Sequence, residues 1–71
     1  MKFFLKSIGE PPMYLLTEFG WSEAAHRRTA SYWWVRYQAE ATAFFSVADA
    51  WLAFDRSSSG ARKDYTLETL A

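Results

Sequence analysis

The chain has 71 residues, no cysteine, a single histidine and a formal net charge of zero at pH 7. A chain of this length supports one hydrophobic core, so we expect a single domain over residues 1–71 that buries only about 60 per cent of its unfolded surface. The composition excludes disulfides and thiolate or multi-histidine metal sites, and the neutral charge argues against a protein that binds duplex nucleic acid through a basic face.

The first part of the chain predicts two strands. Residues 2–8 alternate, with Phe3 and Leu5 on one face, and residues 9–12 are glycine, glutamate and two prolines, which are typical of a turn. Residues 13–19 alternate again. Two short strands joined by a Gly/Pro loop predict an antiparallel hairpin.

The apolar runs of the chain are short. The three apolar residues before Lys6 are fewer than the about 7–15 that a signal peptide needs. The longest uncharged run, residues 41–48, is far shorter than the roughly 20 residues of a membrane span. We therefore expect a cytoplasmic protein without a membrane segment, and the absence of cysteine fits a reducing compartment.

Residues 22–39 fit two different elements. Ser22 could cap a helix that begins at Glu23, and several residues up to Ala39 fall near helical spacing. Residues 31–37, in contrast, are rich in aromatic and β-branched types that favour strands. We favour a strand near residues 32–37 after a loop or a helical turn, with one long helix as the alternative.

The last third of the chain predicts a helix and a strand. Ser46 and Asp49 match a capping box, which predicts a helix over about residues 47–58 with Gly60 in a left-handed conformation after it. Four apolar residues share one face of this helix: Val47, Ala50, Trp51 and Phe54. Residues 64–70 alternate and predict a closing strand. The fold class is therefore α+β, a small antiparallel sheet of three to four strands with one helix packed on it.

Few residues point to catalysis. His26 has Glu23 three residues before it, and Ser22 or Ser31 could serve as a nucleophile, but a histidine beside two arginines is more often a solvated side chain. The carboxylates are scattered singly, and three glycines cannot build a phosphate-binding loop. We expect a protein that is not an enzyme, with no cofactor and no metal.

Aromatic and basic residues concentrate in the middle of the chain. The sequence has fourteen Phe, Tyr and Trp residues, more than its core is expected to need. If residues 32–37 form a strand, Trp33 and Trp34 point to opposite faces, and a single helix covers only one face. The expected partner-binding residues are those of the aromatic and basic segment: Trp21, Arg27, Arg28, Trp33, Trp34 and Tyr37.

The order of residue types resembles that of small proteins encoded by phages and mobile elements. The residues that carry this resemblance are Met13, Tyr14, Leu15 and Leu16 through Gly20 and Trp21, and then Ala43, Phe44, Phe45 and Ser46 before a helix with Ala48, Ala50 and Phe54. Such proteins often follow a strand–strand–helix–strand plan, and some are anti-CRISPR or other host-takeover inhibitors. The resemblance implies a stoichiometric inhibitor that binds and blocks a host protein complex in the host cytoplasm.

Two other functions use the same residues. Aromatic side chains beside Arg27 and Arg28 could bind single-stranded nucleic acid by stacking bases, although the neutral charge favours a protein partner. The surplus aromatics could instead be buried in a homodimer, in which case the protein is a structural subunit.

Overall fold

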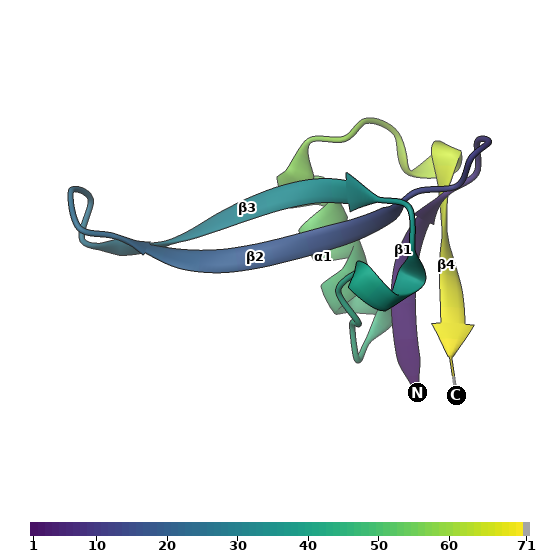
Figure 1. Cartoon of the computed structure of the whole chain (residues 1–71), viewed down its shortest axis with the longest axis horizontal. Coiled ribbons are helices and arrows are strands. Elements are labelled where there is room, and N and C mark those ends of the chain that lie inside the picture. The colour runs from purple at the N-terminus through teal and green to yellow at the C-terminus, as the bar shows by residue number, and fades with distance from the viewer. Residues whose placement is uncertain (71) are drawn as a thin grey trace.

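The computed structural model describes residues 1–70, which form four strands, one α-helix and two short 3-10 helices (Figure 1). The elements are β1 (Lys2–Ser7), β2 (Tyr14–Ser22), β3 (Arg27–Val35), η1 (Gln38–Glu40), α1 (Val47–Ser57), η2 (Arg62–Asp64) and β4 (Tyr65–Leu70). The strands form one antiparallel sheet in the order β3-β2-β1-β4, and α1 packs against one face of it. The predicted α+β class, with a single helix on an antiparallel sheet, is confirmed.

β1 and β2 are antiparallel, but they form much less of a hairpin than the turn between them predicts. β1 pairs with β4 along all six of its residues, whereas it pairs with β2 only at Lys6 and Tyr14. Residues 42–44 fill the gap where the two strands diverge. Phe44 exchanges two backbone hydrogen bonds of 2.8 Å with Phe3 of β1, and the Thr42 N–H donates to the Leu15 carbonyl of β2 at 3.1 Å.

The ambiguous middle segment is a strand, so the helical alternative is wrong. β3 pairs with β2 over nine residues, from Arg27 opposite Ser22 to Val35 opposite Tyr14. It therefore starts earlier than predicted and ends before Tyr37. The Ser22 hydroxyl accepts a hydrogen bond from the Ala25 N–H at 3.2 Å, so it stabilises the turn between the strands instead of capping a helix.

Helix α1 begins where the capping residue predicts. The Ser46 hydroxyl accepts a hydrogen bond from the Asp49 N–H at 3.0 Å, as expected of an N-cap. The helix ends one residue before the predicted end, because Ser58 itself adopts the left-handed conformation, with φ of 56°. Gly60 lies two residues further on with φ of 116°. Val47 is 47% exposed and is not part of the buried face.

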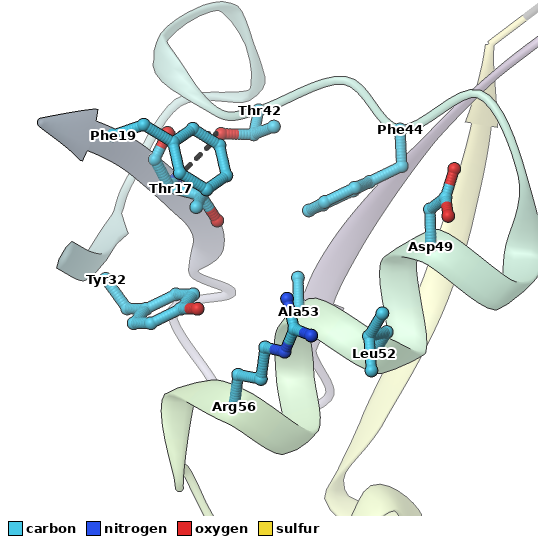
Figure 2. A pocket seen from close by; sticks show the side chains of 9 residues that line it. All are labelled: Thr17, Phe19, Tyr32, Thr42, Phe44, Asp49, Leu52, Ala53 and Arg56. Atoms are coloured by element: carbon cyan, nitrogen blue, oxygen red, sulfur yellow. Dashed lines mark hydrogen bonds between the residues drawn. The ribbon is translucent and has the colours of Figure 1, made fainter. Parts of the chain in front are cut away.

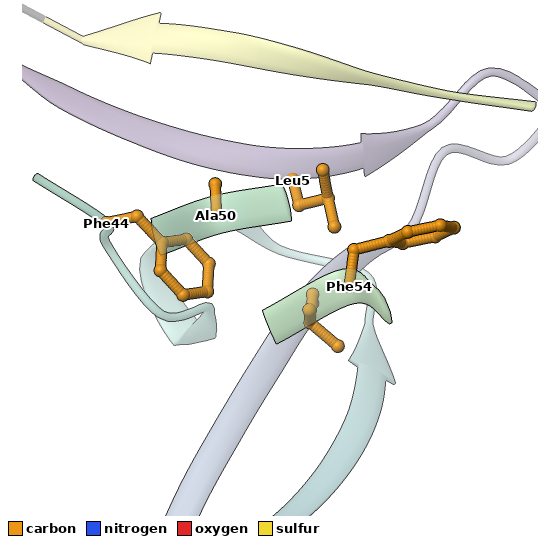
Figure 3. Close-up of a cluster of buried hydrophobic side chains, with 5 residues drawn as sticks. Leu5, Phe44, Ala50 and Phe54 are labelled. Atoms are coloured by element: carbon orange, nitrogen blue, oxygen red, sulfur yellow. The ribbon is translucent and has the colours of Figure 1, made fainter. Parts of the chain in front are cut away.

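The core lies between α1 and the sheet. Its buried members are Leu5, Leu15, Phe44, Ala50 and Phe54 (Figure 3). Phe54 makes an edge contact with Trp51 and packs against Tyr65, with ring centroids 5.5 and 4.6 Å away. Tyr65 in turn stacks on Trp34 at 5.0 Å. These contacts connect α1 through β4 to β3.

A polar cluster lies on the face of the sheet away from α1. Through Glu68 it joins β1, β2, β4 and η1. The Lys6 ammonium donates to the Glu68 carboxylate at 3.0 Å, the Tyr14 hydroxyl donates at 3.2 Å, and the Gln38 amide donates as well. The hydrogen bond from Lys6, together with those from Tyr14 and Gln38, holds the pKa of Glu68 below its ordinary value of 4.5, against the opposing effect of partial burial.

The hairpin of β2 and β3 extends well beyond the core (Figure 1). The molecule measures 38 × 25 × 21 Å along its principal axes. Residues 18–31, which we call the arm, are exposed throughout except for the half-buried Ser22. Their backbones pair with one another, and their side chains add nothing to the buried core.

Candidate functional site

One face of the arm points to the same side of the sheet as α1. Side chains alternate along a strand, so Phe19 and Trp21 share the face of the buried Leu15. Phe19 is 67% exposed and Trp21 is 60% exposed. Their cross-strand partners on this face are Ala30 and Arg28. Two large aromatic side chains on the face of the sheet that carries α1 are thus left exposed.

A pocket of about 250 Å³ lies where the arm meets α1 (Figure 2). Strands β2 and β3 supply one wall, α1 supplies the opposite wall, and residues 42–44 close the space between them. The lining residues are Thr17, Phe19, Tyr32, Thr42, Phe44, Asp49, Leu52, Ala53 and Arg56. The pocket, which Phe19 helps to line, and the side chain of Trp21 two residues further along the same face of β2 together form what we call the arm groove.

The lining of the pocket is mainly apolar, with one acid and one base. Asp49 and Arg56 both lie on α1 and are exposed, and neither takes part in the two ion pairs of residues 1–70, Lys6–Glu68 and Arg62–Asp55. The Thr17 hydroxyl, also in the lining, is buried without a hydrogen-bond partner in the described part of the chain. A bound polar group or a water molecule would satisfy it.

The predicted partner-binding residues do not form one cluster. Trp21 and Arg28 are direct cross-strand neighbours on the groove face. Arg27 and Trp33 lie on the opposite face of β3, where Trp33 is 47% exposed. Tyr37 is 66% exposed in the segment after β3.

Trp34 is half-buried and is held by contacts within its own chain. Its indole N–H donates a hydrogen bond to the Ser59 hydroxyl at 3.1 Å, and its ring stacks on Tyr65. The predicted opposition of Trp33 and Trp34 is therefore present, and the more exposed of the two is Trp33.

Sequence reasoning missed Phe19, Leu52 and Arg56 as site residues. Phe19 could have been found from its position two residues before Trp21, since both lie on one face once the strand continues to Ser22. Leu52 and Arg56 carried no such signal, because the pocket exists only where α1 meets the arm.

The described residues show no candidate metal site and no candidate membrane-spanning helix. His26 lies in the turn at the tip of the arm, exposed and with φ of 50°. Residues 1–70 contain no group of three or more His, Cys, Asp or Glu side chains placed to hold a metal ion. No helix within them is long and apolar enough to cross a membrane.

No protein-family model, no characterised protein and no solved structure matches this chain. The function is therefore inferred from the arm groove itself.

Proposed function

We propose that this protein is a non-catalytic binding module whose arm groove takes an apolar side chain of a partner protein. The observation that carries the proposal is the exposure of Phe19 at an apolar pocket, with the exposed Trp21 following it on the same face of β2. Exposed aromatic residues next to a concave apolar surface are typical of binding hot spots, because their burial on association releases much ordered water.

The charges around the groove indicate the chemistry of the partner segment. Arg28 lies across from Trp21, and Arg56 lies at the pocket, whereas Asp49 is the only acidic residue of the lining. An apolar anchor followed by acidic residues would match this arrangement, since charges at the rim of an interface set register and association rate.

The arm as a whole favours a protein partner over single-stranded nucleic acid. Arg28 beside Trp21 could hold a stacked base. However, Arg27 and Arg28 are balanced by Glu18 and Glu23 in the same arm, so the arm has no net positive charge to attract phosphates.

Binding through such a groove would block a surface of the partner without any chemical step. This agrees with the function that the resemblance to small phage and mobile-element inhibitors implies. Under this proposal, the protein inhibits a host protein complex by stoichiometric occupation of a surface, as anti-CRISPR proteins do.

A selection from a random peptide library displayed on phage tests the groove even while the partner is unidentified. We expect the wild-type protein to enrich peptides with a large apolar residue next to acidic residues. The double variant Phe19→Thr/Trp21→Thr keeps strand-forming residues but lacks both aromatics, so it should lose this enrichment. Trp33→Thr, on the opposite face, is the matched control and should keep it. Equal enrichment by the double variant, or none by the wild type, would contradict the proposal.

A further inference from the structure

The outer edge of β3 is the longest stretch of unpaired strand backbone among the described residues. β3 is an edge strand of nine residues whose inner side pairs with β2 along its whole length. No backbone hydrogen bond outside that ladder involves residues 27–35. The N–H and C=O groups on its outer side are therefore free to pair with another strand.

Apart from the charges of Arg27 and Arg28 at its start, β3 lacks the features by which edge strands avoid pairing with another chain. It contains no proline and no lysine, and its register with β2 is continuous, so no bulge twists the edge away. Its first five residues, 27–31, are exposed. A second strand could reach this edge along at least this stretch.

The distribution of side chains along β3 makes it complementary to itself. Arg27 and Arg28 lie at one end, Trp33 and Trp34 lie at the other, and the residues between include threonine, alanine and serine. In an antiparallel pair of two copies, each arginine end meets a tryptophan end, where cation–π contacts can form. A parallel pair would instead place the arginines of both copies side by side.

Symmetry restricts the register of such a pair, and full overlap of the two strands then selects one register. Directly opposite residues must share a face, so a symmetric antiparallel pair is centred on a residue, and the middle of β3 is Ser31. This register overlaps all nine residues and places Arg28 of one copy opposite Trp34 of the other. It also places Thr29 opposite Trp33.

We propose that a second copy of this chain adds its β3 to the outer edge of β3, antiparallel and centred on Ser31, so that two four-stranded sheets become one. Two nine-residue strands form an interface at the small end of specific interfaces, so the dimer exchanges with the monomer. The second copy joins at the edge of the sheet and in its plane, so it does not stack on the face that carries Phe19 and Trp21.

Sedimentation equilibrium of the full chain tests the proposal. We expect the mass to rise from 8.2 kDa towards twice that value as the concentration increases from about 10 µM to about 1 mM, the range expected for a small interface. Ser31→Lys should remain a monomer, because the centred register places two lysines opposite each other. Within its own chain the new lysine lies opposite Glu18, so the fold should be retained, as circular dichroism would verify.

A mixture of two variants tests the register itself. Ser31→Glu should also be a monomer alone, with its fold checked by circular dichroism because the new glutamate lies opposite Glu18. An equimolar mixture with Ser31→Lys should dimerise again. Thr69→Lys, at an exposed position on the other edge strand β4, is the control and should dimerise like the wild type. A wild type that stays monomeric, a dimeric Ser31→Lys, or a monomeric Thr69→Lys would each overturn the proposal.

Discussion

At the scale of single residues, Glu68 is the most connected polar group of the described chain. It accepts hydrogen bonds from Lys6, Tyr14 and Gln38, which lie on β1, on β2 and in η1. The cluster therefore holds together the part of the sheet where β1 and β2 share only one pair. Because the pKa of Glu68 is lower in the folded protein than its ordinary value of 4.5, the stabilisation is present above that value and is lost as the pH falls below it.

Glu68→Gln should remove part of the acid sensitivity of the fold. The wild type is expected to lose thermal stability between pH 7 and pH 3, and the variant should lose less, because it has no carboxylate to protonate at this site. Thermal unfolding followed by circular dichroism at both pH values measures this. Asp55→Asn, which breaks the exposed pair with Arg62, is the control. It should change the loss of thermal stability between pH 7 and pH 3 less than Glu68→Gln does. An unchanged pH dependence in Glu68→Gln would contradict the role given to the cluster.

At the scale of elements, the predictions that held were those that depend on local sequence. Ser46 predicted the start of α1, and alternation predicted that Phe3 and Leu5 share a face of β1 and that Trp33 and Trp34 point to opposite faces of β3. The predicted antiparallel pairing of β1 and β2 is present but short, because residues 42–44 bond to both strands, a contact between segments far apart in the sequence. The arm groove was missed for the same reason, since α1 and the arm meet only in the folded chain.

The arm should be the least protected part of the sheet against hydrogen exchange. Residues 18–31 pair only with each other and lie outside the core, so their backbone hydrogen bonds can open locally. In protein dilute enough to be monomeric, we expect their amides to exchange at least roughly tenfold faster than those of the β1–β4 ladder. NMR-detected exchange measures both sets in one sample. If the arm amides exchanged as slowly as those of the β1–β4 ladder, the arm would not be an independent extension.

At the scale of the whole molecule, the surplus of aromatic residues divides between the core and the arm region. Phe44 and Phe54 are buried in the core, and Trp34, Trp51 and Tyr65 pack against it. Phe4 and Tyr14 are buried on the other face of the sheet. Among residues 1–70, five aromatic side chains are exposed: Phe19, Trp21, Trp33, Tyr37 and Phe45. Four of these five belong to the hairpin or the residues just after it, so most of the exposed surplus lies where the chain extends away from its core.

The central claim is that the aromatic residues of the arm serve binding and contribute little to folding, and equilibrium urea unfolding of Phe19→Thr/Trp21→Thr tests it most directly. In dilute, monomeric protein, we predict that the free energy of unfolding changes by less than about 1 kcal/mol, as for surface substitutions that keep strand-forming residues. Truncation of a buried aromatic residue costs about 3–5 kcal/mol. A loss of about 3 kcal/mol or more in the double variant would place these side chains in the core and contradict the claim.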